Sequence, residues 1–255
     1  MSGFRTATCS AALCSAALCS AALLSLAGAA VAHADDTGSL TAQQISQRSH
    51  EALLGAKSLH VMATGDLATP GSPTSFDLTL DRSGNCRGSV SLGPQGSVEI
   101  VKRGADVWMK PDAAFWKNEV PGGGSALASL VGNRYLKGTT NDPVLRDTTG
   151  VCDLDTFQKY LDTSAKMPAT GLTKGRPTTV DGIAVIPVTA TEQGRTYTLD
   201  VAATGKSYPV RITVAKGSAA PDATVRFDGF DRPVPTATPP AAETVDISGL
   251  MSGTS

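Results

Sequence analysis

The chain has 255 residues, of which 41% are hydrophobic and 18% are charged, and its formal net charge is −1. This composition is typical of a globular protein with one large domain or two small ones, and the 26 glycines and 15 prolines favour a turn-rich β protein. Because the charge is near neutral and the sequence lacks a basic run, nucleic-acid binding is not expected.

Residues 1–34 have the features of an export signal. Arg5 supplies a positive charge, residues 7–31 are almost entirely Ala, Leu, Ser and Cys, and Ala32-His33-Ala34 has the small-x-small form of a signal-peptidase site. We expect cleavage after Ala34 and export to the medium or the outer face of the envelope; a retained membrane helix is the alternative. None of the three cysteines in this segment fits a lipidation signal well, so a lipid anchor is not expected.

A polar leader, 35–40, precedes the first predicted helix, 41–56, where Thr41 and Gln44 can form a capping box. Apolar and polar residues then alternate over about five segments up to residue 110, which predicts an antiparallel meander with one apolar face. That face carries Leu59, Val61, Phe76, Leu78, Leu80, Val98, Ile100, Val107 and Met109.

The middle of the chain departs from this alternation. We predict a helical turn, a short helix, a short strand, a polar loop and a longer helix, at residues 112–116, 125–131, 134–137, 139–150 and 153–165. The short helix carries Leu127, Leu130 and Val131, and the longer helix carries Phe157 and Leu161. Gly122-Gly123-Gly124 could let the short helix swing as a lid, and a plain surface loop is the alternative.

A second predicted meander occupies residues 171–230. Its five strands are expected at 172–180, 183–191, 195–202, 207–215 and 223–230. Asp181-Gly182 suits a type I′ hairpin turn. The apolar face carries Tyr197, Leu199, Val201, Val210, Ile212 and Val214. We therefore expect one domain at 41–232, followed by a proline-rich tail, 233–255, that runs along its surface.

Cys86 and Cys152 are the two cysteines outside the export signal. In an oxidising compartment an even pair predicts a disulfide, which would close a loop of about 66 residues and contribute about 4 kcal/mol in the chain-entropy model. Two buried free thiols or half of a metal site are the alternatives. The metal site has little support, because only His50 and His60 accompany the cysteines in the mature chain.

Catalytic motifs are missing from the sequence. It contains no G-x-S-x-G, no H-E-x-x-H, no P-loop and no G-x-G-x-x-G. His50 and His60 are interpreted as surface residues, and the aspartates fall on polar strand faces or at turns and caps. We therefore expect no enzyme, no catalytic residue, no cofactor and no metal; an unrecognised hydrolase is the alternative.

The expected fold is mainly β, with a single curled antiparallel sheet of about eleven strands and a few short helices on its concave face. Too few helices are available to fill that face, which predicts an apolar cavity; a fully packed core is the alternative. The candidate cavity residues are Phe76, Leu78, Leu80, Val98, Ile100, Val107, Met109, Leu127, Leu130, Val131, Phe157, Leu161, Tyr197, Leu199, Val201, Val210, Ile212 and Val214.

Several segments together resemble a known family. They are ADVWMKPDAAFW at 105–116, CDLDTFQKYL at 152–161, TVDGIAVIPVTA at 179–190, TYTLDVAATGKSYPVRI at 196–212 and PPAAETVDI at 239–247. This chain looks like the actinobacterial LppX/LprG-type lipoproteins, which are related in fold to the LolA/LolB carriers. The resemblance implies a half-open barrel, plugged by helices, that carries lipids or lipidated molecules through the envelope.

The expected function is therefore binding and transport of a lipid or acylated ligand by a monomer, with a membrane surface or an envelope transport protein as a further partner. An envelope sensor or interaction module with the same fold is the alternative. The resembling motifs are architectural and not catalytic, so they predict the fold better than the ligand.

Overall fold

The computed structural model describes residues 37–65, 74–119, 124–164, 167–168, 170–217 and 220–247. The predicted export signal and Gly122-Gly123 of the predicted hinge lie outside these residues. The described helices are α1 (Ala42–Leu54), α2 (Ala113–Glu119), α3 (Ser125–Val131), α4 (Pro143–Thr149) and α5 (Leu154–Ser164), with 3₁₀ turns η1 (Thr37–Ser39), η2 (Gly93–Gln95), η4 (Gly150–Cys152) and η5 (Ala241–Glu243).

The described strands form one thirteen-stranded sheet, in the order β13-β6-β5-β4-β3-β2-β1-β12-β11-β10-β9-β7, with β8 also paired to β9. Their bounds are β1 (Ser58–Gly65), β2 (Ser75–Asp81), β3 (Cys86–Ser91), β4 (Ser97–Arg103), β5 (Asp106–Pro111), β6 (Tyr135–Thr139), β7 (Thr173–Lys174), β8 (Thr178–Val180), β9 (Ile183–Glu192), β10 (Arg195–Ala202), β11 (Pro209–Lys216), β12 (Ala223–Asp228) and β13 (Thr244–Asp246). The predicted fold class, a large curled and mainly antiparallel sheet with few short helices, is confirmed.

The two predicted meanders are joined edge to edge by β1 and β12. These strands pair antiparallel, from His60 opposite Asp228 to Gly65 opposite Ala223. The first strand of the domain therefore lies beside the last strand of the second meander, and one sheet results. Its two ends are β13, which pairs parallel with β6, and β7.

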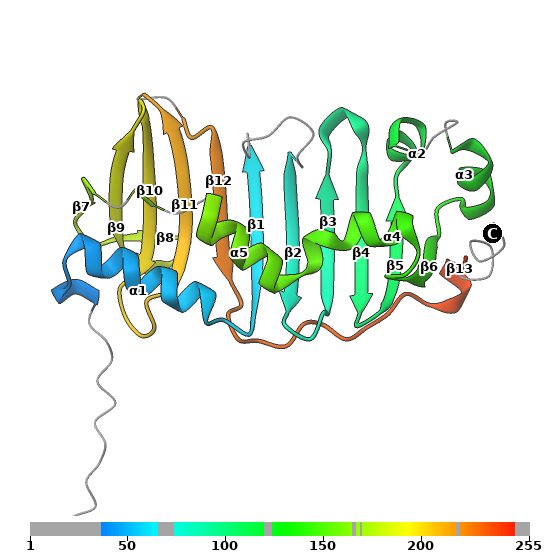
Figure 1. Ribbon diagram of the computed structural model, residues 1–255, viewed down its shortest axis with the longest axis horizontal. Helices are drawn as coiled ribbons and strands as arrows, with labels where there is room; N and C mark the ends of the chain where they lie inside the picture. Colours follow the sequence, from blue (N-terminus) through cyan, green and yellow to red (C-terminus); the bar gives the residue numbers. More distant parts are fainter. Residues whose placement is uncertain are drawn as a thin grey trace, which may run out of the picture. The chain divides into compact units, whose positions relative to one another are not determined.

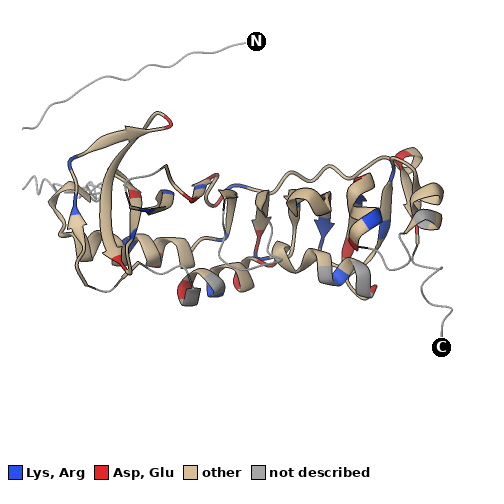
Figure 2. Ribbon diagram, turned by 90° about the horizontal axis from the view of Figure 1, so that it is seen from above, with Lys and Arg blue, Asp and Glu red and all other residues tan. Residues whose placement is uncertain are grey.

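The helices α1, α4 and α5 lie on one face of this sheet, which we call the helix-covered face (Figures 1 and 2). Helix α1 crosses β9, β10 and β11, and α4 packs on β5 and β6. The opposite, open face carries the polar members of each alternating strand. The apolar residues of β1 to β5 point toward the helices, where Leu59, Leu80, Val107 and Met109 are completely buried.

A strap, residues 229–243, connects β12 to β13 along one set of strand ends (Figure 1). Ser58 Oγ donates a hydrogen bond to the Arg232 carbonyl at 2.6 Å, and Arg87 Nη1 donates to the Ala237 carbonyl at 3.1 Å. Val234 is buried. The strap therefore has fixed contacts with β1 and β3.

The predicted polar loop at 139–150 is wrong, because it contains α4. Pro143 occupies the start of this helix, where its missing N–H costs nothing. Asp142 Oδ2 accepts a 2.7 Å hydrogen bond from the Thr139 backbone and holds the preceding turn. Leu145 is fully buried beneath the helix, but residues 143–149 lack the repeated apolar spacing by which sequence patterns identify a longer helix.

The strand predicted at 172–180 is interrupted and forms β7 and β8 instead. Gly175 and Pro177 separate the two pieces. A Cβ atom on residue 175 would lie 2.7 Å from Pro187 Cγ of β9, and the Gly175 N–H donates to the Pro187 carbonyl at 2.8 Å. Regular pairing with β9 ends here because the backbones of Gly175 and Pro187 approach closely and because Pro177 has no N–H to donate.

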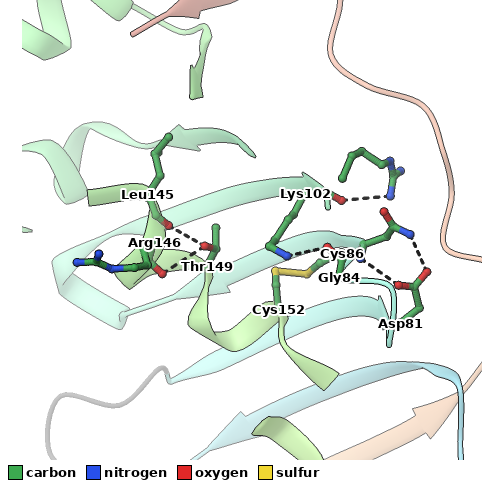
Figure 3. The surroundings of a disulfide bond; sticks show 10 residues. Asp81, Gly84, Cys86, Lys102, Leu145, Arg146, Thr149 and Cys152 are labelled. Carbon is green, nitrogen blue, oxygen red and sulfur yellow. Dashed lines mark hydrogen bonds between the residues drawn. A yellow bond between two sulfur atoms is a disulfide. The ribbon is translucent and has the colours of Figure 1, made fainter. Parts of the chain in front are cut away.

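Cys86 and Cys152 form the predicted disulfide, with their Cα atoms 5.5 Å apart (Figure 3). Cys86 begins β3, Cys152 ends the η4 turn before α5, and both are completely buried. Nearby, Lys102 Nζ donates to the Gly84 carbonyl at 2.8 Å and closes the turn that leads to Cys86. The disulfide fixes the start of α5 to the first meander.

Replacement of both cysteines by alanine is expected to lower the free energy of unfolding by about 4 kcal/mol, because the unfolded chain then regains the entropy of a long loop. Urea unfolding of the variant and the oxidised protein measures this difference. Peptide mapping without reductant should recover the two cysteines in one linked fragment. Two freely alkylated thiols in the exported protein would contradict the assignment.

His60 lies on the open face where the two meanders meet. Its Nε2 is 2.8 Å from Asp77 Oδ1 of β2, and its Nδ1 is 3.0 Å from Asp228 Oδ1 of β12. Burial lowers the pKa of His60, but the hydrogen bonds and charges of Asp77 and Asp228 outweigh it and raise the pKa above 6.5. A protonated His60 therefore links three strands across the junction.

The His60 interaction should make stability depend on pH. Because the folded-state pKa is raised, the stabilisation is fully present below about pH 6.5, the unfolded value, and is lost as the pH rises through the folded pKa. Replacement of His60 by glutamine should remove that component, while Thr79→Gln on the neighbouring strand should not. The urea midpoint, measured from about pH 5 to about pH 9, reports this pH-dependent stabilisation. Parallel pH profiles for the wild type and His60→Gln would contradict the prediction.

Candidate functional site

A cavity of about 410 Å³ opens between α1, the end of α5 and strands β10 and β11. We call it the helix-side cavity. Its apolar lining includes Leu53 of α1, Leu161 of α5, Met167, Leu199 of β10 and Ile212 of β11. The volume lies within the range of about 300–1,000 Å³ that is typical of small-molecule sites.

Polar side chains of α1 line the other side of this cavity. They are Gln43, Ser46, Gln47, Ser49, His50 and Glu51. His50 Nε2 lies 2.8 Å from Asp162 Oδ1 of α5, so the two helices are also linked by a polar contact. The arrangement combines an apolar sheet side with a helix that supplies hydrogen-bonding groups.

Helix α1 begins where the sequence predicts. Thr41 and Gln44 form the complete capping box, and the helix ends at Leu54. Ile45, on the face toward the sheet, is fully buried and packs in one cluster with Ile186, Val188, Leu199 and Val201. This packing seats α1 on the second meander and sets one wall of the cavity.

The C-terminal end of α1 is held by a buried amide. Gln158 of α5, 4% exposed, donates from Nε2 to the Leu53 carbonyl at 2.7 Å. Its Oε1 accepts a 2.7 Å hydrogen bond from Arg82 Nη2, and the same guanidinium donates to the carbonyls of Leu54 and Ala56. These contacts satisfy carbonyls that a helix end leaves without partners, and they fix α1 against α5.

The structure gives the predicted cavity residues several different positions. Leu161, Leu199 and Ile212 line the helix-side cavity. Most of the first-meander residues instead pack tightly in the main core; these are Leu78, Leu80, Val98, Ile100, Val107 and Met109, together with Val131 of α3. Phe76 and Phe157 pack edge to face beside that core, with ring centroids 6.3 Å apart.

The remaining predicted residues do not line this cavity. Val201 packs beneath α1, and Tyr197 lies opposite Val214 where both are half-buried. Leu130 is 48% exposed. The side chain of Leu127 lies outside the described set, so the lid hypothesis stays a prediction.

Val210 lies apart from Ile212 because the strand register changes. Asp200 pairs with Arg211, but the next residue, Val201, pairs with Pro209, which is a β-bulge. Val210 consequently packs with Val180 and Val185 in a separate cluster, while Pro209 lines the cavity. The alternation of apolar and polar residues in the sequence cannot reveal such a change of strand register.

Sequence reasoning missed the polar side of the cavity. Gln43, Gln47 and His50 recur at three- and four-residue spacing on α1, next to the face that carries Ile45. That spacing identifies a continuous helix surface. Its relation to a cavity depends on where α5 packs, which the sequence of α1 does not contain.

The described part of the chain shows neither a metal cluster nor a membrane-spanning helix. There, no group of three or more His, Cys, Asp and Glu side chains is placed to hold a metal ion. Within the same residues, no helix has both the length and the apolar character needed to cross a bilayer.

The fold matches the solved structure of a mycobacterial protein. No protein-family model and no curated sequence matches this chain. The crystal structure of LprF from Mycobacterium bovis superposes with a TM-score of 0.50 at 18% identity, over 78% of this chain and 96% of that one. The chain has the LprF fold. The Mycobacterium tuberculosis lipoprotein LppX gives a TM-score of 0.47 at 15% identity, over 77% of this chain and 98% of LppX.

The LprF likeness extends over both meanders, since it covers most of each chain. At 18% identity it establishes the arrangement of the backbone and not a shared ligand. The predicted resemblance to LppX/LprG-type proteins is thereby confirmed for the fold. The chemistry of the helix-side cavity must be argued from its own residues.

Replacement of Gln158 by alanine should destabilise the protein by about 1–3 kcal/mol, because the Leu53 carbonyl and the Arg82 guanidinium lose a buried partner. The matched control is Lys159→Ala on the exposed side of the same helix. Urea unfolding measures both, and hydrogen exchange should show faster opening of the α1 end. Equal stability of the two variants would contradict the proposed clamp.

Proposed function

We propose that this protein binds a lipid or acylated molecule in the helix-side cavity and carries it through the cell envelope. The observation that supports this most directly is the cavity itself, which has apolar walls from α5, β10 and β11 and polar groups along α1. An acyl chain would contact Leu161, Leu199 and Ile212. A polar head group would contact the α1 side.

Apolar burial can provide the binding energy. At about 25 cal/mol per Å², burial of roughly 300 Å² of acyl chain contributes on the order of 7 kcal/mol before ordering costs. The clamped helices reduce the ordering cost, because the cavity walls are held by Gln158 and by packing of Ile45. Micromolar affinity is the expected scale.

Export and transport are supported by the N-terminal segment of the sequence and by the fold. The sequence begins with a segment that has the features of an export signal, and the LprF fold is consistent with the family resemblance of the sequence. A lipid that leaves a membrane needs an apolar enclosure in water, which such a cavity can provide. These observations support a role in the envelope or outside the cell.

The proposed lipid binding can be tested with a substitution that fills the cavity and introduces no buried charge. Ser46→Trp on α1 should lower the affinity for a fluorescent fatty acid at least about tenfold, because the indole occupies volume that the acyl chain needs. Arg48→Trp places the same ring on the exposed side of that helix and is the control. Circular dichroism checks that both variants keep the fold.

Lipid released from the purified protein is the second measurement. Solvent extracts of protein from its native host, analysed by mass spectrometry, should contain a stoichiometric lipid that the Ser46→Trp variant lacks. If the wild type takes up neither a fluorescent fatty acid nor a fluorescent phospholipid and carries no extractable lipid, the proposal fails.

A further inference from the structure

The open face contains a second hollow, of about 630 Å³, over β1 to β4 with Tyr135 of β6 at its side. We call it the open-face groove. Strand register places its residues in two cross-strand rows. One row runs Met62, Asp77, Ser89, Glu99, and the next runs Thr64, Ser75, Ser91, Ser97.

Differences in side-chain size produce this hollow. Ser89, Ser91 and Ser97 occupy its centre on β3 and β4, while Met62 on β1 and Tyr135 on β6 are long side chains at its two sides. Arg87, also in the lining, donates to the Ala237 carbonyl of the strap. The groove therefore has a small polar floor between larger walls.

Hydroxyl groups dominate the lining. They belong to Thr64, Ser75, Ser89, Ser91, Ser97 and Tyr135. Two carboxylates, Asp77 and Glu99, and one guanidinium, Arg87, lie among them. The Tyr135 hydroxyl donates to Glu99 Oε2 at 2.7 Å. Burial and this hydrogen bond raise the pKa of Tyr135 to about 12, so the hydroxyl keeps its proton.

We propose that the open-face groove is a binding site for a neutral oligosaccharide. Sugar hydroxyls donate and accept hydrogen bonds as serine and threonine do, and carboxylates are strong acceptors for them. The Tyr135 ring and Met62 supply apolar surface for the C–H faces of a sugar ring. The hydrogen-bonding groups of the polar floor thus lie between partly apolar walls.

Other ligand classes fit this groove less well. Glu99 repels phosphate and other anionic groups, the charge of Asp77 is shared with His60, and Arg87 is the one cation among the lining residues. A peptide added as a further strand needs free backbone groups, but β2, β3 and β4 are each paired with a neighbour on both sides. A long acyl chain would leave the hydroxyl groups without partners.

The site is independent of the proposed lipid cavity. The helix-side cavity is lined from α1, α5, β10 and β11, whereas the groove belongs to the first meander and the opposite face. The two lining sets share no residue. Loss of one activity should therefore leave the other unchanged, and the two proposals can fail separately.

The experiment titrates the full mature protein with maltohexaose, mannohexaose, cellohexaose and chitohexaose by isothermal titration calorimetry. At least one should bind saturably at millimolar concentration. Ser89→Trp, which fills the floor, should abolish that binding, and Glu99→Gln should weaken it about tenfold through loss of charged hydrogen bonds. Thr213→Trp, on the open face of β11 outside the groove, should bind as the wild type does.

Each variant is also assayed with the fluorescent fatty acid to show that the fold and the helix-side cavity remain intact. A variant that loses sugar binding but keeps its circular dichroism spectrum and urea midpoint supports the groove assignment. The proposal is overturned if none of the four hexasaccharides binds, if Ser89→Trp binds them as well as the wild type, or if sulfated heparin fragments bind more tightly than every neutral sugar.

Discussion

Antiparallel pairing of β1 with β12 is the interaction on which the rest of the structure depends. Without it, the chain would form two separate meanders, each with an exposed edge strand. With it, the apolar faces of both meanders become one continuous surface that a few helices can cover. His60 strengthens the junction on the open face through Asp77 and Asp228, and the strap holds its end through Ser58. The disulfide then ties α5 to the first meander.

The helix-covered face is packed unevenly, and this unevenness produces the candidate site. Over the first meander, Leu80, Val107 and Met109 are completely buried against the inner helices and loops. Over the second meander, α1 contacts the sheet through Ile45 but leaves space between Leu53, Leu161, Leu199 and Ile212. The buried Gln158 amide keeps this space bounded by α1 and α5. A cavity therefore occurs where two clamped helices meet the sheet, and not along the whole face.

The two faces divide the chemistry between them. The alternation that places apolar side chains toward the helices necessarily places hydroxyls and charges on the other side. On β2, β3 and β4 they include four serines, Ser75, Ser89, Ser91 and Ser97, which are too short to fill the surface between Met62 and Tyr135. The proposed sugar groove and the proposed lipid cavity thus derive from opposite sides of one sheet.

The sequence by itself determined the strands, the α1 capping box and the cysteine pair, because alternation, capping and oxidation are local or compositional signals. The eleven or so expected strands became thirteen, since β7 and β8 separate at Gly175 and Pro177 and β13 forms only beside β6. Three predicted cavity residues line the helix-side cavity, while most first-meander candidates are packed. Tertiary structure alone decided which residues line the cavity, because the cavity volume depends on how α1 and α5 meet. It also decided the position of Val210, because a β-bulge changes which side of the sheet a residue faces without any change in composition.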